Sequence, residues 1–212
     1  MAIITISRGS YGRGKEVAEI VAERLSYRCI AREVLLEASS DFNIPSLKLV
    51  RAIHDAPSII ERMGSGKERY INYIHLALLK HFQQDNVVYH GLAGHFFAQG
   101  ITHALKVRIL SDFEDRVRLE MEREKIPREE AVRILRDDDE QRRRWSLHLY
   151  GIDTRDPELY DLTLNVKQLS AGDVASIIVS AASLPCFRRT QASQRAIEDM
   201  IVRYQGMVDG HK

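Results

Sequence analysis

AIITISRGSYGRGKEVAEIVAERL, residues 2–25, is the stretch that decides the fold. Residues 2–6 form a short apolar, β-branched run, which predicts a buried strand of a parallel sheet. A glycine-rich loop follows, and from Val17 to Leu25 the apolar residues recur at helical spacing. A strand, a glycine-rich loop and a helix therefore come in immediate succession.

The segment from Gly9 to Lys15 matches the pattern GxxxxGK. Backbone N–H groups of such a loop, together with a helix N-terminus, form a cradle for phosphate oxygens. Lys15 lies in the first helical turn, where its ammonium can reach β- and γ-phosphates. A simple glycine turn between strand and helix is the alternative. We expect the cofactor-binding residues to be Arg8, Gly9, Ser10, Tyr11, Gly12, Arg13, Gly14, Lys15 and Glu16.

Glu16 stands where the motif usually has Ser or Thr to hold Mg²⁺. Two roles stay open for this carboxylate. It could hold Mg²⁺ through water, or it could only favour the helix N-terminus. The sequence therefore assigns no protein residue as a metal ligand.

The rest of the chain alternates between strand and helix patterns, which predicts an α/β fold with a parallel sheet flanked by helices. The strand candidates are 28–30, 86–90, 104–110 and 161–166, and the helix candidates are 32–40, 67–84, 112–125, 127–151 and 170–184. We expect one domain over 1–185, with a helical insertion at about 41–84 and a lid-like segment at about 136–150. Residues 186–212 are predicted to be a tail or linker with a weak helix at 193–204.

The composition is that of an ordinary globular protein, with 44% hydrophobic residues, 29% charged residues and a net charge of +1. A near-neutral chain is a poor candidate for sequence-independent nucleic-acid binding. The cysteines, Cys29 and Cys186, form no ligand pattern, which favours a reducing cytoplasm and no metal site. Cys29, beside Ile30, is expected in the core. No apolar run suits a signal peptide or a membrane span.

Several further segments carry a resemblance to a known family. They are ITISRGSYGRGKEVA at 4–18, AREVLLEAS at 31–39, VYHGLAGHFF at 88–97, VRILSDFEDRVRLEMEREKIPREEA at 107–131 and LYDLTLNVKQLS at 159–170. Over residues 2–184 the chain resembles the cytidylate-kinase-like family, relatives of the nucleoside monophosphate kinases. The resemblance implies a three-layer P-loop kinase fold with helical acceptor and lid insertions. It also implies ATP and Mg²⁺ as cofactors and transfer of the γ-phosphoryl group to a nucleoside monophosphate.

By the same resemblance, Lys15 would hold the donor phosphates during catalysis, and RDDDEQRRR at 136–144 would be the mobile lid. Converging guanidinium groups suit a developing negative charge. The lid candidates are Arg136, Arg142 and Arg143, with Asp139 orienting one of them. The alternative is an exposed helix whose charges pair at i,i+4, as Asp139–Arg143 and Glu140–Arg144.

Two departures from the family concern the acceptor. Relatives carry Gly-Arg after the third strand, where this chain has Gly91-Leu92, and Asp before Arg where this chain has Ala31-Arg32. Arg32 and His90 are the candidate substrate-binding residues, although His90 could equally be a hydrogen-bonded histidine at a strand end.

With Glu16, these departures leave a second hypothesis open, a catalytically reduced nucleotide sensor, and a third, a structural protein with a vestigial loop. The expected partner is a small-molecule nucleotide. The sequence leaves open whether the chain forms a homo-oligomer, and whether the insertion at 41–84 is a dimer face or a substrate lid.

Overall fold

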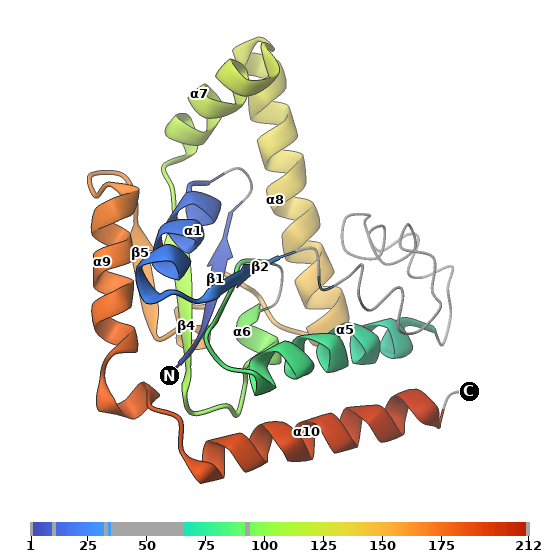
Figure 1. Ribbon diagram of the computed structural model, residues 1–212. Helices are drawn as coiled ribbons and strands as arrows, with labels where there is room; N and C mark the ends of the chain where they lie inside the picture. Colours follow the sequence, from blue (N-terminus) through green and yellow to red (C-terminus); the bar gives the residue numbers. More distant parts are fainter. Residues whose placement is uncertain (1, 10–11, 32–33, 35–65, 92–93, 211–212) are drawn as a thin grey trace.

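The computed structural model describes residues 2–9, 12–31, 34, 66–91 and 94–210. Its centre is a parallel sheet with the strand order β2-β3-β1-β4-β5. The strands are β1 (Ile3–Arg8), β2 (Arg28–Ile30), β3 (Val87–Tyr89), β4 (Ala104–Leu110) and β5 (Leu162–Asn165). The strand–loop–helix unit at the start of the chain thus supplies the central strand, and the α/β fold predicted from the sequence is confirmed (Figure 1).

Most of the described helices lie in segments predicted to be helical, whereas the short helix α6 was not predicted. They are α1 (Gly14–Leu25), α5 (Gly66–Gln83), α6 (Gly94–Phe97), α7 (Phe113–Glu124), α8 (Arg128–Tyr150), α9 (Ala171–Ala182) and α10 (Gln191–Asp209), with short 3-10 turns at Pro157–Leu159 and Pro185–Phe187. Ser170 caps α9 through a reciprocal capping box with Asp173, as its sequence pattern indicates. Among the described helices none is long and apolar enough to cross a membrane.

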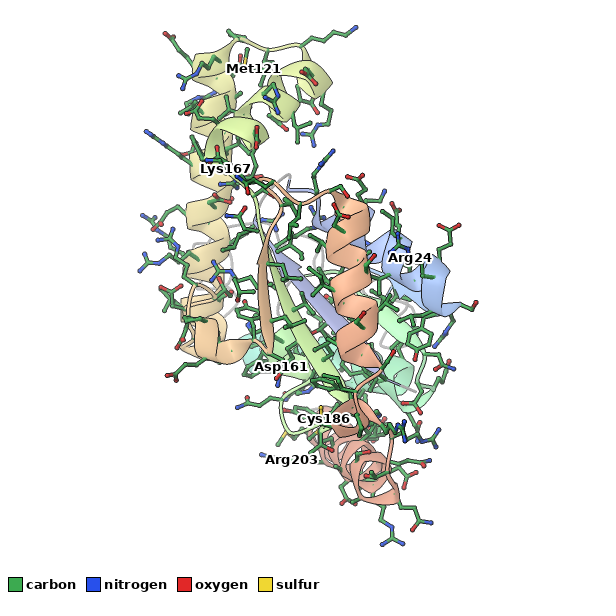
Figure 2. The ribbon with its side chains drawn as sticks, turned by 90° about the vertical axis from the view of Figure 1, so that its left-hand side faces the viewer. Arg24, Met121, Asp161, Lys167, Cys186 and Arg203 are labelled. Atoms are coloured by element: carbon green, nitrogen blue, oxygen red, sulfur yellow. The ribbon has the colours of Figure 1, made fainter. Side chains whose placement is uncertain are left out.

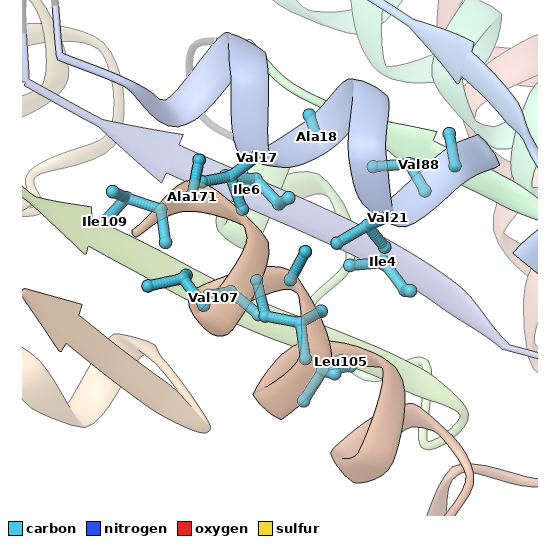
Figure 3. Close-up of a cluster of buried hydrophobic side chains, with 14 of the residues drawn as sticks. Ile4, Ile6, Val17, Ala18, Val21, Val88, Leu105, Val107, Ile109 and Ala171 are labelled. Carbon is cyan, nitrogen blue, oxygen red and sulfur yellow. The ribbon is translucent and has the colours of Figure 1, made fainter. Parts of the chain in front are cut away.

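Alternation along the strands divides the core into two layers. Ile4 and Ile6 of β1 face α1 and α9, together with Leu105, Val107 and Ile109 of β4 (Figure 3). Successive strand side chains point to opposite faces, so the intervening β4 residue Arg108 belongs to the other face of the sheet.

The other face of the sheet is covered by α5, α6 and α10. Ile3 and Val87 pack there against Leu78 and Phe82 of α5 and against Ile197 of α10. The apolar side of α5, within the helix predicted at 67–84, therefore faces the sheet. The helix expected at 32–40 and most of the insertion at 41–84 lie outside the described residues, which begin again at Gly66.

The C-terminal segment packs on this second layer instead of extending away from it. Helix α10 is longer than the weak helix predicted at 193–204, and it runs alongside α5 (Figure 1). At its start, Arg189 donates to the buried carboxylate of Asp85 at 2.8 Å, and His103 lies 2.9 Å from the other oxygen of that carboxylate. The segment that leads into α10 is thus tied to the sheet layer through the buried carboxylate of Asp85.

The hairpin of α7 and α8 projects beyond the sheet edge where the parallel strands end (Figure 1). The hairpin has a small hydrophobic core of its own, which consists of Val117, Ala131 and Leu135 between the two helices. Figure 2 shows Met121 at the far end of the hairpin and Lys167, which follows β5, near its base. At this base, Arg116 of α7 and Asp139 of α8 lie against Gly9, which follows β1.

Candidate functional site

The glycine-rich loop runs from the end of β1 to the start of α1, and its glycines make room for close neighbours. A Cβ atom on Gly14 would lie 2.5 Å from Cδ of Arg8, and one on Gly12 would lie 2.9 Å from Oγ of Ser111. Neither position could hold a side chain without displacing its neighbour. The loop thereby brings its backbone against the end of β4, next to the N-terminus of α1, where an anion is favoured.

The charged side chains at the start of α1 pair with one another along the helix. Nζ of Lys15 lies 3.6 Å from the carboxylate of Glu19, and the Glu16 carboxylate lies 3.4 Å from Nε of Arg13. All four side chains are about half exposed or more, so these pairs are weak and can exchange for a ligand. Ser10 and Tyr11 of the predicted loop lie outside the described residues.

A cavity of about 300 Å³ opens beside the loop, and we call it the arginine cavity. Among its described lining residues, Asp139 is the single acid, and the hydroxyls come from Ser7, Ser111 and Thr154. Its guanidinium groups come from Arg8, Arg108, Arg116, Arg142, Arg143 and Arg155. This excess of positive charge, with convergent hydroxyl groups, suits a ligand that carries several negative oxygens.

Arg116 and Asp139 form a bidentate ion pair in the wall of this cavity. The guanidinium of Arg116 donates to both carboxylate oxygens of Asp139, at 3.0 and 2.8 Å. Arg116 is only 8% exposed, and its guanidinium also lies 5.4 Å from the ring centre of Phe113. The pair joins α7 to α8 beside Gly9 of the glycine-rich loop.

Tyr160, just before β5, contacts two residues that line the arginine cavity. The hydroxyl of Tyr160 lies 3.3 Å from Oγ of Ser7 and donates to the carbonyl of Thr154 at 3.0 Å. Burial raises the pKa of Tyr160 above its usual value, so its hydroxyl stays protonated at neutral pH. The ring of His95 lies 4.9 Å from that of Tyr160, and burial, reinforced by Arg108 and Lys106, lowers the pKa of His95 to about 4. His95 is therefore neutral beneath a positively charged site.

The lid candidates lie in different places along α8. Arg142 and Arg143 line the arginine cavity, and Nε of Arg143 lies 3.2 Å from the carboxylate of Asp153. Arg136 lies further along the hairpin, with its guanidinium 5.7 Å from the ring centre of Phe113. Asp139 was expected to orient one of these three arginines, and the structure shows it bound to Arg116 of α7. The expected Glu140–Arg144 pair is present at 2.9 Å.

A second cavity, of about 210 Å³, lies on the other side of the loop, and we call it the α7 cavity. Arg13 borders it from the loop, and Asp112 and Lys167, which form an ion pair at 3.2 Å, border it from α7 and from the segment after β5. Ser111 and Arg116 line both cavities. The Ser111 hydroxyl is buried and has no hydrogen-bond partner among the described residues. Two adjoining spaces thus share one wall beside the glycine-rich loop.

The cytidylate kinase-like family matches residues 3–168. The chain belongs to this family. Its curated relatives include a cytidylate kinase of Sulfolobus acidocaldarius, 27% identical over 181 residues, which covers 84% of this chain and 93% of that protein.

Among solved structures, an uncharacterised protein from Eubacterium ventriosum superposes with a TM-score of 0.65 at 18% identity, covering 85% of this chain and 97% of that one. A protein from Thermus thermophilus has a TM-score of 0.51 at 16% identity, with coverages of 86% and 97%. At these identities the two structures support the fold alone.

The described residues of this cytidylate kinase-like chain do not form a protein cage for Mg²⁺. No group of three or more His, Cys, Asp or Glu side chains that could hold a metal occurs in the described part of the chain. The Glu16 carboxylate is engaged by Arg13, and hydrogen bonds from Lys167 and from the Glu114 amide lower the pKa of Asp112. Mg²⁺ that binds together with a nucleotide needs only one or two protein carboxylates beside the phosphate oxygens, and the exposed Glu16–Arg13 pair can exchange for such a ligand. Glu16 would then hold the ion through water, and we derive no catalytic step through it.

Of the two candidate acceptor-binding residues, the structure describes only His90. Arg32 lies outside the described residues. His90 follows β3, is partly buried, and donates its backbone amide to the carbonyl of Ile30 at 3.0 Å. It does not line the arginine cavity or the α7 cavity. Its role in substrate binding stays a prediction.

Three arginines of the cavity were missed by sequence reasoning: Arg108, Arg116 and Arg155. Arg108 interrupts the apolar run of β4, and this position was a usable signal, because a charged residue inside a buried strand needs a polar site to face. Arg155 lies in an irregular segment without periodicity, so only the folded chain reveals its place.

Proposed function

We propose that this chain is a phosphotransferase that moves the γ-phosphoryl group of ATP to a nucleoside monophosphate, cytidylate-like, or to a related small phosphate acceptor. The observation that carries the proposal is the wall that the two cavities share. Ser111 and Arg116 border both spaces, and Gly9 and Gly12 of the loop lie against these two side chains. A reaction of two substrates needs two adjoining sites, with the transferred group between them.

The donor would bind on the α1 side of that wall. Backbone N–H groups of the loop and the N-terminus of α1 would hold its phosphates, and Lys15 would exchange its exposed partner Glu19 for phosphate oxygens. The Ser111 hydroxyl is available as a further donor to the phosphate chain. The α7 cavity, with Arg13 and Lys167, would take the remainder of the nucleotide.

In the transfer step, an oxygen of the acceptor phosphate forms a bond to the γ-phosphorus. The bond from that phosphorus to the bridging oxygen of ATP breaks, and ADP leaves with the electron pair. The products are ADP and a nucleoside diphosphate. Such reactions depend on positioning and on stabilising charge on the equatorial oxygens. Arg116, fixed by Asp139, and Arg142 and Arg143 of α8 would supply that charge.

The test is a phosphoryl-transfer assay in which purified protein, ATP and Mg²⁺ meet a panel of nucleoside monophosphates. We expect one acceptor to be phosphorylated, and Lys15→Ala to lower kcat/KM by roughly 100-fold or more. Lys80→Ala, which removes an exposed lysine of α5, is the matched control and should retain activity. The absence of turnover with every acceptor would contradict the proposal.

One observation favours a second candidate, a nucleotide sensor without catalysis. The position that usually offers a hydroxyl to Mg²⁺ is Glu16, and its carboxylate pairs with Arg13. A sensor would bind ATP and fail to transfer phosphate. ATP would then raise the Tm of the wild type and leave that of Lys15→Ala unchanged, because a ligand that binds only the native state stabilises it. If no nucleoside triphosphate raises the Tm, a structural role is favoured instead.

A further inference from the structure

Charge balance within the arginine cavity is uneven. Arg116 and Arg143 each have a carboxylate partner, Asp139 and Asp153 respectively. Arg108 and Arg155 line the same cavity, and among the described residues neither forms an ion pair with a carboxylate. Arg155 acts electrostatically on Asp153, but that carboxylate is already paired with Arg143. Positive groups therefore exceed carboxylates in this part of the cavity, which favours the binding of an anion.

Arg108 is held in place by contacts that leave part of its guanidinium available. Its Nη1 donates to the backbone carbonyl of Arg155 at 2.6 Å, and its Cζ lies 5.7 Å from the centre of the Tyr160 ring. The segment that carries Arg155 is fixed in turn, because the amide of Arg155 donates to Asp153 at 2.9 Å. Arg108 on β4 and Arg155 on the braced segment beside it are thus two neighbouring cations with fixed backbones.

We propose that Arg108 and Arg155 bind the phosphate group of the acceptor substrate, and so act as acceptor-specific binding residues on the β4 side of the arginine cavity. This inference rests on the proposed phosphotransferase function. It places the acceptor between the sheet and α8, with its phosphate facing Ser7, Arg108 and Arg155.

The position of Arg108 in its strand separates this role from donor binding. Val107 and Ile109 pack in the cluster beneath α1 and α9, so Arg108 projects from the opposite face of the sheet. Gly9, at the start of the loop, lines the arginine cavity with Arg108, whereas Arg13, next to the start of α1 where the donor phosphates would bind, lines the α7 cavity beyond Ser111 and Arg116. A cation at Arg108 is therefore suited to the second substrate.

The test compares steady-state kinetics of three variants with equal changes of charge. Arg108→Gln and Arg155→Gln each remove one cation from the cavity, and Arg133→Gln removes an exposed cation of α8 outside it. We expect both cavity variants to raise the acceptor KM roughly tenfold or more while the ATP KM changes less than about twofold, since each loses a charge-assisted hydrogen bond to phosphate. Arg133→Gln should resemble the wild type.

Arg155→Gln is the decisive variant because the Arg155 side chain is exposed, whereas Arg108→Gln also removes a bond that braces the segment. An equal rise in the KM of both substrates, or an unchanged acceptor KM, overturns the inference.

If the wild type transfers no phosphate, CMP binding measured by calorimetry tests the acceptor site separately from the phosphotransferase function. Loss of CMP binding in Arg155→Gln, with ATP binding retained, supports the acceptor site although the kinase proposal fails. A wild type that does not bind CMP, or an Arg155→Gln variant that binds it unchanged, counts against the site itself.

Discussion

Arg116 of α7 and Asp139 of α8 form a bidentate ion pair in which Nη1 and Nη2 of the guanidinium each donate to a different carboxylate oxygen, at 3.0 and 2.8 Å. The Arg116 side chain is 10% exposed and that of Asp139 is 26% exposed, so the pair is largely shielded from water. It is also the link between the two helices at the wall that both cavities share. The pair therefore fixes a cation where the proposed transfer takes place.

Asp139→Asn should weaken this link and destabilise the protein. An asparagine keeps one acceptor oxygen but turns an amide N–H₂ group toward the guanidinium, which leaves Arg116 partly uncompensated. We expect the free energy of unfolding to fall by about 2 kcal/mol, measured by urea denaturation. Asp137→Asn, at an exposed position on the same helix, should have little effect. Equal stability of the two variants would show that the pair contributes nothing.

The strands and helices could be predicted because their signals are local. The β-branched run of β1, the glycine-rich loop and the periodic helix at the start of the chain indicate the fold, and the pattern of Ser170 and Asp173 locates the start of α9. Cys29 was expected in the core, and that prediction was wrong: β2 is an edge strand of the sheet, and Cys29 is exposed. A segment as short as Arg28–Ile30 does not reveal which strand lies at an edge.

The candidate site was harder to predict because it depends on contacts between distant segments. Arg142 and Arg143 lie in a recognisable basic run, and both line the cavity. The partner of Asp139 lies 23 residues away in another helix, and Arg108 and Arg155 are 47 residues apart. Local periodicity contains no information on such pairs, so the charge balance of the site follows only from the fold.

Tyr160→Phe should loosen the floor of the arginine cavity with a modest cost in stability. The variant removes the hydroxyl that contacts Ser7 and donates to the carbonyl of Thr154, and it keeps the ring that packs on His95. A net loss of about 1 kcal/mol is expected in chemical denaturation. Tyr204→Phe is the control, since no described group hydrogen-bonds that hydroxyl. A Tyr160→Phe protein as stable as this control would argue against the brace.

Stability should fall as the pH drops below about 6.5, because two buried histidines are neutral in the fold. Burial lowers the pKa of His75 to about 4, and its ring packs 3.9 Å from that of Tyr204. His95 has a similar pKa. Between the folded value near 4 and the ordinary value of 6.5, the unfolded chain binds more protons, so acid favours unfolding.

Each of these histidines contributes up to about 1.4 kcal/mol per pH unit in that window. His75→Phe keeps an aromatic ring beside Tyr204 and removes one titrating group. We therefore expect it to lose roughly half of the slope of unfolding free energy against pH, measured by urea denaturation at several pH values between 4.5 and 7.5. A slope identical to that of the wild type would mean that His75 is not buried in its neutral form.

Arg189→Met should release the start of α10 from the sheet layer. Asp85 is 2% exposed and accepts from Arg189 at 2.8 Å, so loss of the guanidinium leaves a buried carboxylate with His103 as its remaining partner in the described network. Because the Asp85 carboxylate is buried while Arg189 is partly exposed, loss of this charged hydrogen bond should cost about 2 kcal/mol. The cost should be seen in urea denaturation and as faster proteolysis within 186–212. Arg188→Met, at the neighbouring exposed position, removes the same charge without touching Asp85. If both variants are cleaved at the wild-type rate, α10 is held by its apolar face on α5 alone.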